Sequence, residues 1–170
     1  TKLIRVAETN FEDSESAELA KTTAYLRDMT VNFIIAGRDT TACALSWLTY
    51  ELCKNPEAEQ KLHAELDGII GDRIPSFDDF ADTHYLTACI SETLRLHPSV
   101  PFDIKNTVEA DVLPSGTRLK PGDALAYIPY TMGRMEWLWG PDATEFRPDR
   151  WIDANGAFRR EEQCKFTAFQ

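Results

Sequence analysis

Residues 25–54 constrain the fold more than any other part of the chain, because this long stretch contains neither proline nor a cluster of turn-forming residues. Apolar residues recur along it at helical spacing, at Leu26, Met29, Phe33, Ala36, Leu45, Leu48 and Leu52. We therefore predict one continuous helix over residues 25–54, unusually long for a globular protein. A chain that contains such a helix is expected to be mainly helical.

Further helices follow the long one. Asn55 and Pro56 predict a new start, with asparagine as the cap and proline in the first turn. That helix is expected to run to Ile70 and to stop at Gly71. Ser76 with Asp79 resembles a capping box that opens a short helix. Another helix is predicted over residues 86–96, and it ends before Pro98 because proline disfavours helical geometry in the residue before it.

The pattern changes beyond Pro101. Residues 117–119 and 123–130 are short β-compatible runs, bounded by the turns at 114–116 and 121–122. From Gly140 onward the chain is rich in proline, aspartate and aromatic residues, which predicts an ordered loop. Residues 1–24 are polar and acidic and are expected to form a linker or a helix end. We predict one domain over 1–170, mainly α with a small β portion, whose residues 25–170 comprise a helical core, a small sheet and an aromatic loop.

Composition excludes some functions. A net charge of −10 and a pI near 4.7 argue against nucleic acid as a partner, which would require clustered Lys and Arg. The 4 cysteines form no Cys-x-x-Cys pair, and three lie in predicted helices, so reduced structural thiols are expected. The histidines are isolated, so the sequence predicts no zinc site built by this chain alone, and no stretch approaches the length of a membrane span.

The middle of the long helix carries the first candidate site, residues 36–41. Glycine at position 37 costs about 1 kcal/mol relative to alanine inside a helix. The Thr40 hydroxyl is expected to bond back to the Ala36 carbonyl and bend the helix. Such a bend opens a groove against the backbone, which can admit a small ligand such as dioxygen. Asp39 and Thr40 would supply a short proton path to it. The alternative is a glycine that allows close helix packing, with two solvated polar side chains.

Glu92 and Arg95, three residues apart on a predicted helix, form the second candidate. One interpretation is an exposed ion pair worth a few tenths of a kcal/mol. The other is a partly buried pair, because apolar Ile90, Leu94 and Leu96 are interleaved with it. A buried pair needs further partners to offset desolvation. Arg150, in an aromatic loop, is the expected third member.

These motifs in this order, Gly-x-Asp-Thr-Thr, Glu-x-x-Arg and Pro-Asp-Arg-Trp, resemble the cytochrome P-450 family. The resemblance runs from about Tyr25 to Gln170, which implies the C-terminal half of the cytochrome P-450 fold, from the long central helix to just before the haem-ligand loop. It implies that Glu92, Arg95 and Arg150 form a buried triad that supports the haem-binding core. It also implies that Asp39 and Thr40 are catalytic and deliver protons, and that the oxygen groove is formed by Ala36, Gly37 and Thr41.

A finer resemblance rests on residues 132–135, 139–140, 145–148 and 165–169. These segments are similar to the eukaryotic members that hydroxylate fatty acids near the chain terminus, the omega-hydroxylases. The resemblance implies that residues 100–103 face the substrate, with Phe33, Val100 and Phe102 as substrate contacts. It also places Lys105 where a basic residue reaches a haem propionate, although a solvated lysine is an equal alternative.

The haem ligand itself is expected outside the chain. In the family, Phe169 would begin the loop Phe-x-x-Gly-x-Arg-x-Cys-x-Gly, so the cysteine thiolate would lie about six residues past Gln170. The resemblance thus implies a fragment of a haem b monooxygenase, with no metal ligand in this chain, and the fragment by itself is expected to be inactive.

For the parent protein, the resemblance implies an apolar substrate, such as a fatty acid, and NADPH used indirectly through NADPH–cytochrome P-450 reductase. It also implies an anchor in the endoplasmic reticulum membrane, on the cytosolic face. One alternative is a naturally truncated, haem-free, non-catalytic helical domain. Another is a haem enzyme that rearranges peroxides, against which the Asp39-Thr40 pair argues, because such an enzyme needs no oxygen-linked proton delivery.

Overall fold

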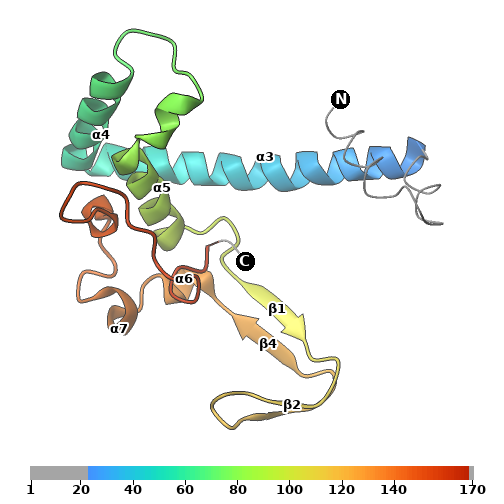
Figure 1. The fold of residues 1–170 in the computed structure, drawn as a ribbon. Helices are drawn as coiled ribbons and strands as arrows, with labels where there is room; N and C mark the ends of the chain where they lie inside the picture. Colours follow the sequence, from blue (N-terminus) through green and yellow to red (C-terminus); the bar gives the residue numbers. More distant parts are fainter. Residues whose placement is uncertain (1–22, 169–170) are drawn as a thin grey trace. The chain divides into compact units, whose positions relative to one another are not determined.

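The structure is a computed structural model that describes residues 23–168. The chain divides into two compact units, residues 1–42 and 43–170, and each is described by itself. The fold is mainly helical with a small antiparallel sheet portion, as expected (Figure 1). The linker expected over residues 1–24 falls almost wholly outside the described residues.

Helix α3, Thr23–Lys54, confirms the predicted long helix and begins two residues earlier than expected. It crosses from the first unit into the second. Threonine hydroxyls bond back to the preceding turn: Thr30 Oγ1 donates to the Leu26 carbonyl (2.8 Å), and Thr40 Oγ1 donates to the Ala36 carbonyl (2.7 Å). The bond expected from Thr40 is therefore present, and the helix continues through it.

Helix α4, Pro56–Ile69, begins at the proline with Asn55 at the cap position, as predicted, but the Asn55 side chain makes no cap bond. Its Nδ2 donates back to the Glu51 carbonyl (2.8 Å) and to Glu51 Oε2 (3.2 Å). The Asn55 carbonyl accepts the backbone N–H groups of Ala58 and Glu59, so the backbone of Asn55 starts α4 while its side chain ties down the last turn of α3.

The capping box expected at Ser76 is only half formed. The short helix is a 3₁₀ turn, η1, Asp78–Ala81, whose cap position is Phe77, with no side-chain cap bond. Asp79 accepts bonds from the backbone N–H (2.6 Å) and the hydroxyl (2.9 Å) of Ser76, and also from Arg73. These donors, Arg73 above all, hold the pKa of Asp79 well below its usual range.

Helix α5, His84–Leu96, confirms the predicted helix over residues 86–96. Its N-terminus is capped from a distant helix. The carboxylate of Glu65 on α4 accepts the backbone N–H groups of Tyr85 (2.6 Å) and Leu86 (2.9 Å). These are among the donors that a helix leaves without partners at its start, so one carboxylate both caps α5 and docks α4 against it.

The strands form two antiparallel pairs. Strand β1, Asp103–Asn106, pairs with β4, Ala124–Tyr127, and β2, Asp111–Val112, pairs with β3, Arg118–Leu119. Figure 1 shows this ribbon extending away from α5 and α6. The β-compatible runs predicted at 117–119 and 123–130 both contain a strand, β3 and β4. The second ends at Tyr127, because Pro129 begins a helix, and β1 and β2 were not predicted.

Three short helices stand where the sequence suggested strand or loop. They are α6 (Pro129–Met132), α7 (Glu136–Trp139) and η2 (Pro148–Trp151). Helix α5 packs against α4, α6 and η2. Between α6 and α7, a Cβ on Gly133 would lie 2.0 Å from the Arg95 carbonyl oxygen, so this approach of the two backbones requires glycine.

The core of the second unit lies around α5. One cluster joins buried Ala88, Trp139, Ala143 and Trp151, and a second joins Leu62, Tyr85 and Cys89. Within residues 23–168, the search for a helix long and apolar enough to cross a membrane finds none.

We expect Trp151→Ala to lower the free energy of unfolding of the full-length protein by about 3–5 kcal/mol, because it empties a buried aromatic site. The Trp151 ring contacts Trp139, Phe158 and Phe166. Trp137, 79% exposed, provides the matched control, and Trp137→Ala should change stability by no more than about 0.5 kcal/mol. Urea unfolding of the two variants measures the difference; equal losses would show that the aromatic cluster is not the core.

Candidate functional site

The carboxylate of Glu92 is completely buried, at 0% exposure, and accepts five hydrogen bonds. Arg95 donates two of them, from Nε to Oε2 (2.7 Å) and from Nη2 to Oε1 (2.8 Å). Arg150 Nε donates to Oε1 (2.8 Å). The Arg147 backbone N–H (2.8 Å) and Trp151 Nε1 (2.9 Å) complete the set. The structure therefore brings together the three residues Glu92, Arg95 and Arg150 that the sequence singled out.

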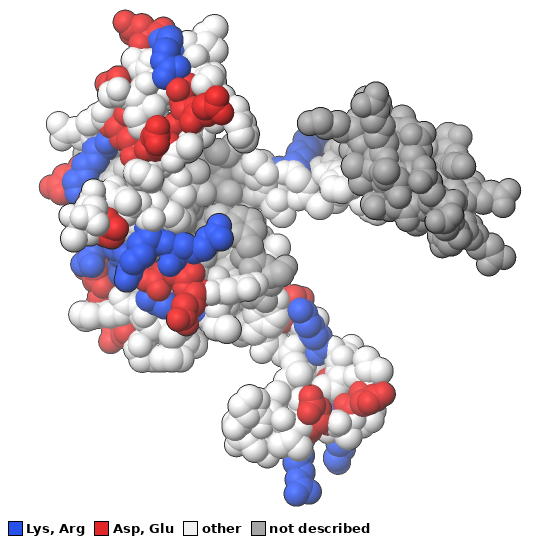
Figure 2. All heavy atoms as spheres, in the orientation of Figure 1, with Lys and Arg blue, Asp and Glu red and all other residues white. Residues whose placement is uncertain are grey.

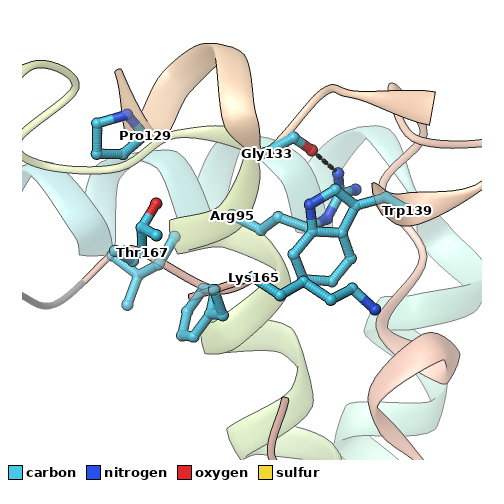
Figure 3. Close-up of a pocket in the computed structure, with 9 residues that line it drawn as sticks. Arg95, Pro129, Gly133, Trp139, Lys165 and Thr167 are labelled. Carbon is cyan, nitrogen blue, oxygen red and sulfur yellow. Dashed lines mark hydrogen bonds between the residues drawn. The ribbon is translucent and has the colours of Figure 1, made fainter. Parts of the chain in front are cut away.

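Arg95 uses its remaining donors to hold loop backbone. Nη1 donates to the carbonyls of Gly133 and Ala143, the latter at 2.5 Å, and Nη2 donates to the Glu145 carbonyl (2.9 Å). Figure 3 shows the guanidinium meeting the Gly133 carbonyl beside the Trp139 ring. The Arg95 Cζ lies 5.1 Å from the centre of that ring, within range of a cation–π contact.

Arg150 links the same carboxylate to a neighbouring acid. Its Nη2 donates to the Asp142 carbonyl (3.0 Å) and lies 3.3 Å from Asp142 Oδ2, and its Nη1 donates to the Trp139 carbonyl (3.2 Å). Arg147 Nη1 lies 2.5 Å from the same Oδ2. Burial by itself would raise the pKa of Asp142, but the charges of Arg150 and Arg147 hold it below its usual value.

The network pairs its buried charges: within the described residues, Asp142 Oδ2 is buried without a hydrogen-bond partner, but it lies within ion-pair distance of Arg147 and Arg150. Removing a carboxylate and a guanidinium from water is costly unless both are paired and hydrogen-bonded. Here Glu92 faces two arginines, and the spare guanidinium donors reach five backbone carbonyls between positions 133 and 145. The network therefore fixes α5, η2 and parts of residues 133–147 in one arrangement.

The cavity beside Arg95 is too small for a cofactor or a substrate. Its volume is about 10 Å³, and its lining includes Pro129, Gly133, Trp139, Lys165 and Thr167 (Figure 3). A volume of this size holds about one water molecule. The Glu92 network is thus a support inside the protein rather than a ligand pocket.

The residues expected to act in oxygen chemistry lie in the first unit, on α3. Asp39 is exposed, and its Oδ1 lies 4.0 Å from Arg38 Nε. The bond from Thr40 to the Ala36 carbonyl fixes the direction of the hydroxyl. A Cβ built on Gly37 would meet open space, and Phe33, Ala36 and Thr41 are exposed. Within this unit, residues 33–41 of α3 therefore present exposed apolar side chains beside a position, Gly37, that has no side chain.

The residues expected to contact substrate in the second unit are half-exposed apolar side chains, Val100 at 51% and Phe102 at 50%. Lys105, on β1, is exposed, and its Nζ lies 5.9 Å from the centre of the Tyr127 ring. Tyr127 Oη donates to Asp103 Oδ2 (2.7 Å), which lowers the pKa of Asp103 and raises the pKa of Tyr127. This end of β1 thus presents apolar side chains beside one cation.

Comparison with known proteins identifies the family. A sequence model described as Cytochrome P-450 matches residues 6–169. The chain belongs to the cytochrome P-450 family. Cytochrome P-450 86B1 from Arabidopsis thaliana is 48% identical over 158 residues, which cover 85% of this chain and 28% of that protein.

Two further relatives belong to the same family. Cytochrome P-450 704B1 from Arabidopsis thaliana is 40% identical, with 94% of this chain and 35% of that protein covered. Cytochrome P-450 704C1 from Pinus taeda is 45% identical, with 86% and 31% covered. The chain thus spans about a third of the length of the curated relatives that it matches.

Members of the cytochrome P-450 family hold haem iron through a cysteine thiolate, and Cys89 is the buried cysteine among the described residues. Cys89 does not fit: burial, with the charges of Glu65, Asp149 and Glu92, raises the pKa of its thiol to about 12. Over the described part of the chain, no group of three or more His, Cys, Asp and Glu side chains could hold a metal ion. Within the first unit, the exposed small and apolar residues of α3 suit the flat, apolar body of haem. Within the second unit, the Lys105 ammonium suits one of its carboxylates.

The segments behind the finer resemblance mostly surround Glu92. Gly133, Trp139 and Glu145 supply carbonyls to the two buried arginines, and Arg147 supplies its N–H to the carboxylate. Their positions are explained by this support.

Sequence reasoning missed several members of the network, namely Trp151, Asp142 and the Arg147 backbone. Trp151 was in the quoted motif, and its indole N–H, a donor that a buried tryptophan must pair, was a signal that could have found it. Backbone donors and acceptors carry no sequence signal of their own.

Replacing Glu92 with glutamine should destabilise the full-length protein by about 3–5 kcal/mol, because two buried guanidinium groups lose their counter-charge. The matched control is Asp28→Asn, which removes the carboxylate of an exposed pair with Arg27 and should cost no more than about 1 kcal/mol. Urea unfolding of both variants checks this, and a loss from Glu92→Gln as small as that from Asp28→Asn would contradict the account.

Cys89 should resist alkylation in the native protein at pH 8, because its raised pKa leaves almost no thiolate, the reactive form. After unfolding in urea it should react at the rate of an ordinary cysteine. Mass spectrometry after iodoacetamide treatment measures both states, and native modification at the unfolded rate would show that the thiol is accessible.

Proposed function

We propose that this chain is part of a haem-thiolate monooxygenase that inserts one oxygen atom of dioxygen into a C–H bond of an apolar substrate. The observation that carries the proposal is the buried Glu92–Arg95–Arg150 network in a member of the cytochrome P-450 family. In this proposal the network is the triad that supports the haem-binding core, and it acts by holding the surrounding loops rather than by contact with substrate.

Haem b is the proposed cofactor, held by residues of this chain and by a cysteine that the sequence resemblance places past Gln170. Ala36, Gly37 and Thr41 would lie along one face of the macrocycle, where the absence of a large side chain at Gly37 leaves room for dioxygen. The Lys105 ammonium would pair with a propionate. The bound iron supplies the activation of dioxygen.

Asp39 and Thr40 are the proposed proton donors to the oxygen groove. The bond from Thr40 to the Ala36 carbonyl holds Oγ1 at a fixed point on α3. Exposed Asp39 exchanges protons with water and would pass them toward that hydroxyl. The pair suits oxygen chemistry that consumes protons, and peroxide rearrangement would not need it.

The proposed substrate is a fatty acid, hydroxylated near its chain terminus. This substrate rests on the finer sequence resemblance, and exposed apolar Phe33, Val100 and Phe102 are compatible with it. An apolar chain buried against such side chains would be bound mainly by the hydrophobic effect.

The proposed electron donor is NADPH–cytochrome P-450 reductase, as the sequence resemblance implies. The parent protein is proposed to be anchored on the cytosolic face of the endoplasmic reticulum membrane. Figure 2 shows acidic side chains gathered over α4 and the loop after it, a distribution that would attract a basic protein surface.

We expect Thr40→Ala to uncouple electron use from product formation in the full-length protein with reductase, NADPH, dioxygen and a fatty acid. Hydroxylated product per NADPH should fall about a hundredfold, at the lower end of the range typical of a positioned proton donor, while Thr40→Ser should retain wild-type coupling.

The control is Thr30→Ala, which removes the same kind of hydroxyl-to-carbonyl bond from the same helix and should leave coupling unchanged. Equal coupling in Thr40→Ala and wild type would contradict proton delivery. No hydroxylated product from the wild-type protein would contradict the monooxygenase proposal.

A further inference from the structure

His97, which ends α5, is joined to the C-terminal part of α3 within the second unit. Its Nε2 lies 2.7 Å from Glu51 Oε1, and the two side chains are only 14% and 12% exposed. Because an ionised carboxylate only accepts hydrogen bonds, the imidazole is the donor. The backbone N–H of His97 still bonds to the Thr93 carbonyl, so the ring is attached to the helix end itself.

Two more residues fix the geometry of this pair. The Trp47 indole, one turn before Glu51 on α3, stacks on the His97 ring with centroids 3.9 Å apart and planes at 2°. Asn55 donates to Glu51 Oε2 (3.2 Å), which holds the second carboxylate oxygen. The stack sets the plane of the imidazole and the hydrogen bond sets its rotation, so the end of α5 has one position relative to this part of α3.

The chain that follows His97 is held again a few residues later. The Pro101 carbonyl accepts the backbone N–H of Tyr130 in α6 (3.3 Å). Arg134 donates to the Leu96 carbonyl and to the Tyr130 carbonyl (3.1 Å), with its guanidinium 3.8 Å from the Tyr130 ring. Residues 98–101 therefore form a short bridge with both ends fixed.

We propose that the Glu51–His97 pair positions this bridge and thereby sets where the substrate lies. The inference rests on the proposed function, in which Val100 and Phe102 contact substrate. These side chains, half-exposed, are carried on the bridge and just beyond it, so a shift of its His97 end moves Val100 with it. His97 and Glu51 are positioning residues; neither is proposed to touch substrate. A pair that only stabilised the fold would change stability without changing where the substrate is oxidised.

The test uses the full-length holoenzyme with reductase and a saturated fatty acid as the probe. His97→Phe keeps an aromatic ring for Trp47 to stack on and removes the donor to Glu51. Glu51→Gln weakens the same contact from the other side without changing its shape. His63→Phe, at an exposed histidine on α4, is the matched control. The readouts are the ratio of hydroxylation positions, KM and kcat separately, and hydrogen exchange of residues 99–102.

We expect His97→Phe to raise KM about threefold or more and to broaden the positions hydroxylated, with kcat and haem content little changed. Amide exchange over residues 99–102 should quicken in His97→Phe and in Glu51→Gln, but not in His63→Phe. The double variant should behave as His97→Phe alone, because the two residues act through one contact.

Three results would overturn the inference. An unchanged product ratio and KM in His97→Phe, while the wild-type enzyme forms product, would refute positioning and leave the proposed function intact. Unchanged amide exchange of residues 99–102 in both variants would show that the Glu51–His97 contact does not hold the bridge, whatever the activity. If His97→Phe does not fold, Glu51→Gln decides by the same readouts. Wild-type enzyme that forms no hydroxylated product refutes the proposed function itself, and the substrate role of the bridge falls with it.

Discussion

The buried negative charge of Glu92 is the constraint on which the second unit depends. A carboxylate removed from water is tolerated only when donors surround it, and here the donors come from α5, from η2 and from the residue before η2. The arginines that neutralise it carry spare N–H groups, and these hold the carbonyls of Gly133, Trp139 and Glu145. One charge thus determines the path of most of the chain after β4.

The sequence predicted the elements whose signals are local. Apolar spacing and the absence of proline predicted α3, Asn55-Pro56 and Gly71 predicted the two ends of α4, Pro98 predicted the end of α5, and turn residues located β3 and β4. What it missed depends on distant partners. Strand β1 has no alternating pattern and is defined by its pairing with β4. The cap of α5 is supplied by Glu65 on another helix, and Asn55, a suitable cap by type, bonds backward to Glu51 instead. For the site, Arg150 was predicted as the third member because a buried ion pair needs further partners and this arginine lies in an aromatic loop, but the backbone donors could not be predicted.

The residues that hold the second unit together differ from those proposed to take part in oxygen chemistry. The cavity beside Arg95 holds about one water, and the Glu92 carboxylate bonds only to other groups of the protein, so the role of the network is structural. The proposed chemistry lies on α3, where Thr40 has a fixed hydroxyl, and the proposed substrate contacts lie on the bridge after α5, held by His97 and Glu51. Family membership follows from the sequence match, whereas activity, substrate and partners are proposals that these placements make testable.

The central claim is that Glu92 and Arg150 are one coupled unit, and a double-mutant cycle tests it most directly. Free energies of unfolding of the full-length protein would be compared for Glu92→Gln, Arg150→Gln and the double variant. The account predicts that the double variant loses less than the sum of the single losses, by about 2–3 kcal/mol. Losses that add to within about 0.5 kcal/mol would show that the two residues act independently and would contradict it.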